Sequence, residues 1–136
     1  MRWIVLLLTV LAACAPMTSP TMGTPVSGEL FEREIAGQVM SFRLPANERA
    51  QAQFQPDGTA VYSGGVLNGI GRWRPWKDGY CAYYPWLGGG PGLRPPFSGP
   101  VEEDGYRCYS VRAESGYFVV FQPGGTYVGT LMPVRG

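Results

Sequence analysis

Three cysteines are the side chains in this sequence whose type and spacing point most directly to chemistry. Cys14 follows an apolar run near the start of the chain, whereas Cys81 and Cys108 lie in its second half. The chain contains no histidine, so the Ser-His-Asp and Cys-His arrangements of hydrolytic enzymes cannot form in their usual way. The Cys-x-x-Cys spacing of thiol redox enzymes and the ligand spacing of zinc sites are also absent from the sequence. We therefore expect no enzymatic activity, no metal site and no cofactor.

The first thirteen residues have the features of an export signal. Arg2 is followed by the apolar run WIVLLLTVLAA, which is shorter than the roughly 20 residues that a membrane-spanning helix needs. The run ends in Leu11-Ala12-Ala13-Cys14, and this tetrapeptide resembles the lipobox of bacterial lipoproteins. By that resemblance, residues 1–13 are removed and Cys14 becomes the first residue of the mature protein, with acyl chains such as palmitate attached.

A lipid anchor at Cys14 would fix the protein to a membrane, because two or more acyl chains give stable attachment. Ala15 after the cysteine is similar to lipoproteins sorted to the bacterial outer membrane, where the folded part would face the periplasm. Residues 14–27 carry no charge and include three prolines, and we expect a flexible tether without packed structure there. The alternative is ordinary cleavage, since Ala13-Cys14-Ala15 also fits the small-x-small rule; the product would be soluble in the periplasm or secreted.

If Cys14 carries lipid, Cys81 and Cys108 remain as an isolated pair in an oxidising compartment. The simplest expectation for such a pair is a disulfide. Closing a loop of about 28 residues would stabilise the fold by roughly 3.5 kcal/mol in the chain-entropy model. We expect the bond to be structural.

Tryptophan and tyrosine are concentrated in one part of the sequence. The rings that gather there are Trp73, Trp76, Tyr80, Tyr83, Tyr84 and Trp86, followed by Tyr106 and Tyr109. Most of them are expected to fill a hydrophobic core. Strand alternation places Cys81 and Tyr83 on one face and Tyr80, Ala82 and Tyr84 on the other, so some tyrosines must be exposed or covered by a loop.

The segment 87–105 is the natural cover, because it has no periodic pattern and loops of this length are often functional. Arg94 and Phe97 would fold over the tyrosines and recognise a glycan, a peptidoglycan fragment or a protein loop through stacking and charge. The candidate binding surface comprises Trp76, Lys77, Tyr80, Tyr84, Arg94 and Phe97. The alternative is a flexible excursion without function. The acidic run at 102–104 is interpreted as a solvated charge run.

A short helix is expected just before the strands. Ser27 suits the N-cap, acidic residues follow in the first turns, and Gly37 can supply the left-handed residue after the C-terminus. These signals predict a helix over 28–36. Leu30, Phe31 and Ile35 would share one face and close the open end of the strand structure.

After Gly37 the apolar period changes from 3.6 to 2, as in strands with one solvated face. The stretch 50–55 alternates apolar residues with glutamine, and Pro56-Asp57-Gly58 supplies a tight turn. The pattern predicts eight strands, at 38–44, 50–55, 59–63, 69–74, 80–84, 106–112, 117–122 and 126–131. Short turns between several of them require antiparallel neighbours.

The expected fold is therefore a mainly β domain over 28–136, an antiparallel meander that closes into a small barrel. Closure removes exposed edges, which favours a barrel over the alternative of a sandwich. The interior of an eight-stranded barrel is either filled by side chains or holds one small ligand.

Charge excludes one class of partner. The formal net charge is +1, so the mature chain lacks the positive field that nucleic-acid binding requires. The carboxylates that might act as a catalytic pair fall in expected turns or strand ends; they are Glu48, Asp57, Asp78 and Glu114.

The hairpin motifs resemble a group of small exported bacterial proteins of unknown function. In that group an F-x-x-D-G-T hairpin precedes a G-x-W … G-x-x-C hairpin and a later C-Y strand. The matching positions are Phe54, Asp57, Gly58, Thr59, Gly71, Trp73, Gly79, Cys81, Cys108 and Tyr109. The resemblance implies a β fold with a disulfide and names no activity.

These features predict a membrane-anchored lipoprotein that faces the periplasm and acts as a non-catalytic binding or envelope-structural module. A second resemblance, to membrane-anchored lysozyme inhibitors, implies an alternative in which Ser63 and Lys77 approach the catalytic acids of lysozyme; the Trp-x-Lys-Gly motif of that family is not reproduced intact. A third candidate is a carrier of a small apolar ligand. The expected partners are the membrane, through the anchor, and an envelope protein, a glycan or lysozyme.

Overall fold

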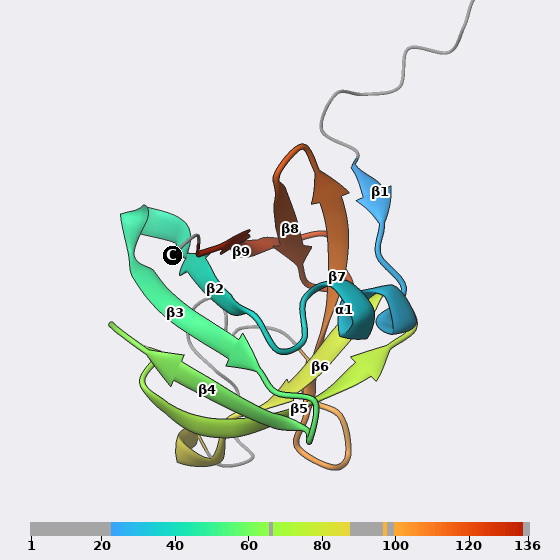
Figure 1. Cartoon of the computed structure of the whole chain (residues 1–136). Coiled ribbons are helices and arrows are strands. Elements are labelled where there is room, and N and C mark those ends of the chain that lie inside the picture. The colour runs from blue at the N-terminus through green and yellow to red at the C-terminus, as the bar shows by residue number, and fades with distance from the viewer. Residues whose placement is uncertain (1–22, 66, 88–96, 98–99, 135–136) are drawn as a thin grey trace, which may run out of the picture.

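The chain folds into a closed antiparallel β-barrel of eight strands, with one extra strand and one α-helix (Figure 1). The computed structural model describes residues 23–65, 67–87, 97 and 100–134. Closure is complete because β7 pairs with both β6 and β8, and β2 pairs with both β3 and β9. The predicted barrel is confirmed, and the sandwich alternative is excluded for the described residues.

Each strand expected from the alternation pattern is present, with small differences at its ends. The strands of the barrel are β2 (Val39–Arg43), β3 (Arg49–Phe54), β4 (Thr59–Ser63), β5 (Gly69–Trp76), β6 (Gly79–Tyr83), β7 (Arg107–Glu114), β8 (Tyr117–Phe121) and β9 (Tyr127–Pro133). Two short 3-10 turns, η1 (Pro45–Asn47) and η2 (Pro85–Leu87), lie between strands. The largest differences are that β5, β7 and β9 each continue two residues beyond their expected ends.

The antiparallel order gives the barrel two distinct ends. The turns after β3, β5 and β7 lie at the same end of the barrel as α1 (Gly28–Glu34). We name this end of the barrel the helix end. The turns after β2, β4 and β8 share the other end with the long connection between β6 and β7. We name this the loop end.

Helix α1 begins where its capping signal predicted. The Ser27 side chain accepts a hydrogen bond from the Leu30 amide at 3.1 Å, which satisfies one of the free amides of the first turn. The helix ends at Glu34, two residues before its expected end, and Gly37 then has a φ of 87°. Phe31 and Ile35 are fully buried, so the helix closes this end of the barrel with the predicted face.

The expectation of an unstructured tether over 14–27 is wrong for its last residues. Strand β1 (Thr24–Pro25) pairs antiparallel with β7, with Thr24 opposite Ala113, and Val26 is fully buried. The cause is the length of β7, which continues past its pairing with β6 and leaves an unpaired edge. Strand β1 fills that edge, as unpaired strand edges favour. The folded domain therefore begins before residue 28.

Aromatic rings fill the barrel interior. Phe31 descends from α1 and stacks on Tyr80, with ring centres 4.6 Å apart. Its ring also contacts Phe54 at 5.2 Å and Trp73 at 5.6 Å. The Trp73 indole nitrogen donates to the Gln55 carbonyl at 2.7 Å, so the polar atom of this buried ring is satisfied. The helix and the barrel wall thus share one core.

Candidate functional site

Five of the six residues predicted as a binding surface are described by the structure, and these five do not form one surface. Tyr80 and Tyr84 point into the barrel and are buried, so the expectation that they belong to a binding surface is wrong. Phe97 is buried as well, with its ring 4.9 Å from that of Tyr84. The predicted contact between the long connection and a tyrosine therefore exists, but the contact itself removes both rings from solvent. Arg94 lies outside the described residues, as does Cys14.

Trp76 and Lys77 lie at the helix end, far from Tyr84 and Phe97. The Lys77 ammonium sits 5.0 Å from the centre of the Trp76 ring. These two residues border an open depression beside the start of α1. Ser63 and Lys77 flank opposite ends of β5, because Ser63 ends β4 at the loop end and Lys77 follows β5 at the helix end. Ser63 and Lys77 are therefore separated by about the length of β5, which is roughly 20 Å or more along the barrel wall.

The alternation argument for β6 is correct in its division of the side chains. Tyr80, Ala82 and Tyr84 share the interior, whereas Cys81 and Tyr83 belong to the outer wall. Tyr83 is half-buried and its ring lies 5.6 Å from that of Tyr106. The alternation pattern alone did not decide which set faces inward, because both sets consist of large or apolar residues.

Four buried tyrosines line the barrel interior. The Tyr109 hydroxyl donates to the Tyr84 hydroxyl at 3.4 Å. The Tyr62 hydroxyl is buried, and it has no hydrogen-bond partner among the residues that the structure describes. Burial raises the pKa of Tyr84 to about 12. It raises the pKa of Tyr62, Tyr80 and Tyr109 well above the ordinary tyrosine value. Burial disfavours the charged form, so these hydroxyls stay neutral at physiological pH.

These pKa shifts predict unfolding at alkaline pH. A group whose pKa is higher in the folded state gives stability that is complete below its unfolded pKa and lost as pH rises toward the folded value. The barrel should therefore lose stability above the ordinary tyrosine pKa, through the value of about 12 expected for Tyr84. Tyr84→Phe should move the alkaline unfolding midpoint upward, since one fewer buried hydroxyl must ionise. Circular dichroism during a pH titration measures this midpoint, and Tyr127→Phe, at an exposed position, is the control.

Trp86 is an exposed aromatic residue of the loop end, as is Tyr127 at the start of β9. Trp86 belongs to η2, and its ring lies against Gly69, where a Cβ would come within 2.9 Å of the indole. The ring also contacts Tyr84 at 5.4 Å and Tyr62 at 6.2 Å. One face of the indole is thereby fixed while the remainder is open to solvent, as in aromatic recognition sites. The sequence pattern gave Trp86 as one ring of the cluster but not its position on the rim.

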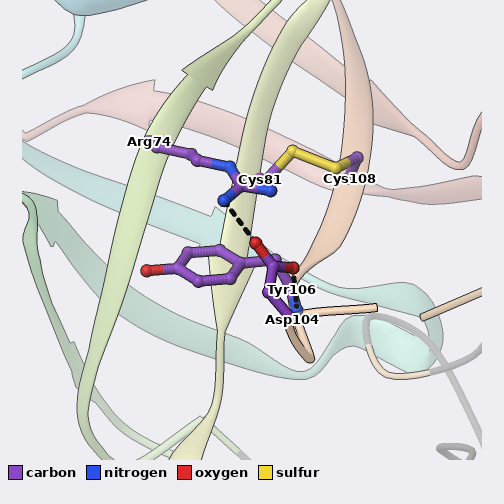
Figure 2. Close-up of a disulfide and its surroundings, with 5 residues drawn as sticks. All are labelled: Arg74, Cys81, Asp104, Tyr106 and Cys108. Carbon is purple, nitrogen blue, oxygen red and sulfur yellow. Dashed lines mark hydrogen bonds and ion pairs between the residues drawn. A yellow bond between two sulfur atoms is a disulfide. The ribbon is translucent and has the colours of Figure 1, made fainter. Parts of the chain in front are cut away.

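The disulfide predicted between Cys81 and Cys108 is present (Figure 2). The two cysteines are opposite each other in the pairing of β6 with β7, and both are buried. Arg74 on β5 faces Cys81 in the next pairing and its side chain extends toward Asp104, as Figure 2 shows. The bond therefore fastens the strands at both borders of the long connection.

Arg74, Asp104 and Tyr106 form a fixed cluster on the outer wall beside the disulfide, which we name the Arg74 cluster (Figure 2). Arg74 Nη1 donates to Asp104 Oδ2 at 2.5 Å, and the guanidinium lies 4.3 Å from the centre of the Tyr106 ring. The hydrogen bond from Arg74, with the Tyr106 amide, holds the pKa of Asp104 below its usual value. The interpretation of 102–104 as a solvated charge run is therefore wrong for Asp104, which has defined hydrogen-bond partners.

An acidic groove opens next to this cluster. It has a volume of about 370 Å³ and is lined by Arg74, Glu102, Glu103 and Asp104. Arg74 already has an ion-pair partner, and two further carboxylates face the solvent. Sequence reasoning missed Arg74. Its signal was that it follows Trp73, which points inward, so strand alternation places Arg74 on the outer face of β5.

The described residues contain no group of three or more side chains arranged as metal ligands. Among these same residues, no helix is long and apolar enough to cross a membrane. Comparison of the chain with protein-family models, with curated proteins and with solved structures finds no match. The resemblance to small exported bacterial proteins therefore stays a prediction.

Proposed function

We propose that the protein is a lipid-anchored binding module of the bacterial cell envelope, without catalytic activity. One observation carries the proposal. The chain that leads back to Cys14 joins the barrel at β1, beside the end of β7 at the helix end. Trp86 and the carboxylates of the acidic groove belong to the connection at the loop end. An anchor and a recognition surface at opposite ends suit a protein that presents a site away from its membrane.

The non-catalytic part of the proposal is supported by the state of the titratable groups. The carboxylates considered as a catalytic pair lie in separate turns and strand ends, and Asp57 caps its own turn by accepting from the Thr59 amide at 2.8 Å. The buried hydroxyls are tyrosines whose pKa values lie above the ordinary value. The buried tyrosine hydroxyls therefore stay protonated near neutral pH and do not act as bases there.

The fixed positions of Trp86 and Asp104, near the two ends of the long connection, support binding. Trp86 is held by Gly69 and two tyrosine rings, and Asp104 is held by Arg74 and the Tyr106 amide. Side chains that are fixed before binding lose little conformational entropy when a partner arrives. An exposed indole and a carboxylate groove on the same long connection fit an envelope glycan or a protein loop.

The other candidate functions receive less support. A small apolar ligand in the barrel would have to displace rings that already contact each other, such as Phe31, Phe54 and Tyr80. A lysozyme inhibitor that uses Ser63 and Lys77 together would need them on one rim, whereas they flank opposite ends of β5.

The anchor is tested by the mass of the amino-terminal peptide. We expect the mature protein to begin at Cys14 with a thioether-linked diacylglycerol and an amide-linked acyl chain, and to sediment with membranes. Cys14→Ser should move the folded barrel to the soluble fraction, because the lipid supplies the attachment. An unmodified amino terminus beyond residue 14 would contradict the proposal.

The recognition surface is tested by photocrosslinking in intact cells. A benzophenone amino acid at position 86 is expected to yield a discrete adduct with a protein or with peptidoglycan. The matched control carries the same amino acid at position 77, at the helix end, and should not yield that adduct. The same adducts from both positions, or none from position 86, would remove the basis for a site at the loop end.

A further inference from the structure

We propose that an apolar patch on the outer wall, formed by Val39, Tyr117, Met132 and Val134, rests on the lipid headgroups of the membrane that anchors the chain. The inference rests on the proposed function, because it needs the anchor at Cys14. It adds a second point of contact and therefore an orientation of the barrel on the bilayer.

The four side chains of this membrane patch are neighbours on three adjacent strands. The Val134 amide donates to the Val39 carbonyl at 3.0 Å. Met132 lies opposite Ser41 of β2. On the other side of β9, Phe118 of β8 is opposite Leu131. One step further in the same antiparallel register, Tyr117 lies beside Met132. Val39, Tyr117 and Met132 lie at or next to strand termini of the helix end, and Val134 directly follows β9 there.

These four apolar side chains are exposed to solvent, although packing of the barrel does not require apolar residues at these outward positions. Val39 is 39% exposed, Tyr117 37%, Met132 49% and Val134 45%. The neighbouring outward positions of β3 are polar, with Gln51 and Gln53 next to β2. The wall of a water-soluble barrel is normally polar in this way, so a contiguous apolar patch indicates a contact surface.

The path of the chain identifies the occupant of the patch. Ala113 of β7 pairs with Thr24 on one side and with Phe118 on the other, so the chain enters two strands away from Tyr117. About nine residues separate Cys14 from Gly23, and such a segment spans at most about 32 Å. A bilayer attached to Cys14 is therefore held within reach of the patch, at high effective concentration.

The chemistry of the patch also favours a lipid surface over a second copy of the chain. Tyrosine is enriched where membrane meets water, because its ring is apolar and its hydroxyl is polar. Four side chains, each less than half exposed, offer far less than the roughly 800 Å² per partner of a stable protein interface. A tethered bilayer needs no such area, since the anchor already supplies the affinity.

The test adds one indole at the patch and one elsewhere. Acylated Tyr117→Trp and Ile70→Trp proteins are each reconstituted into phosphatidylethanolamine and phosphatidylglycerol vesicles, with and without brominated phosphatidylcholine. Ile70 is the matched control because it is 65% exposed on β5, outside the patch. We expect bromolipid to quench the added emission at position 117 roughly twofold, since interfacial groups sit about 5–10 Å into the headgroup region. The added emission at position 70 should not change.

The outcomes separate this inference from the proposed function. Mass analysis of the same samples reports whether Cys14 carries lipid. Acylation with equal quenching at both positions, or with no quenching at position 117, overturns the patch assignment and leaves the anchor intact. An unacylated chain removes both proposals. Sedimentation of unacylated Cys14→Ser provides a further check: a dimer that Met132→Glu dissociates would assign the patch to a second copy instead.

Discussion

Replacing Phe31 by alanine is expected to lower the free energy of unfolding by about 3–5 kcal/mol, the usual cost of removing a buried aromatic ring. The ring is fully buried and stacks on Tyr80 while contacting Phe54 and Trp73. These partners sit on three different strands, so the surrounding rings cannot all move into the space that the ring leaves. Chemical denaturation followed by tryptophan fluorescence measures the change.

Two variants bracket this result. Leu30→Ala, at a half-buried position next to Phe31 on the same helix, should cost only about 1 kcal/mol. Phe31→Leu should cost less than Phe31→Ala, because part of the volume is kept. A loss below 1 kcal/mol in Phe31→Ala would mean that α1 is not part of the cooperative core.

Removing the disulfide by the double substitution Cys81→Ala with Cys108→Ala is expected to cost roughly 3.5 kcal/mol. The bond joins β6 to β7 where the two cysteines face each other. It closes the longest connection in the barrel and so restricts the unfolded chain most strongly there. Small domains have a total stability of about 5–15 kcal/mol, so this loss is a large part of it. Thermal and chemical unfolding of the variant, beside the oxidised wild type, measures it.

The control for the disulfide separates the bond from its surroundings. Arg74→Ala leaves the two sulfurs bonded but removes the guanidinium that pairs with Asp104. We expect a loss below about 1 kcal/mol for this exposed ion pair. Equal losses in the two variants would attribute the stability to the Arg74 cluster rather than to the covalent bond.

Local sequence signals predicted most elements of the fold. Ser27 predicted the start of α1, because a serine side chain can accept a hydrogen bond from a free amide of the first helical turn. The alternation of apolar residues with glutamine in 50–55 predicted β3, because one face of that strand packs in the core and the other faces water. The disulfide also followed from composition, since two cysteines in the oxidising compartment that the export signal predicts have few alternatives.

Several features that depend on the register between strands distant in the sequence could not be predicted. Arg74 and Asp104 meet because β5, β6 and β7 are in a particular register, which no local pattern encodes. Tyr80 and Tyr84 were placed on a binding surface because alternation separates two faces without saying which is the interior. Strand β1 has no periodicity of its own, and it forms because β7 offers an unpaired edge.

Strand β1 also determines where mechanical load enters the molecule. Tension on the amino-terminal chain is transmitted first to the pairing of Thr24 and Pro25 with β7 and to the burial of Val26. Strand β7 then distributes the force to both of its neighbours in the barrel and, through Cys108, to a covalent link with β6. A pull on the chain end therefore acts first on this two-residue pairing and reaches the wall of the barrel through β7.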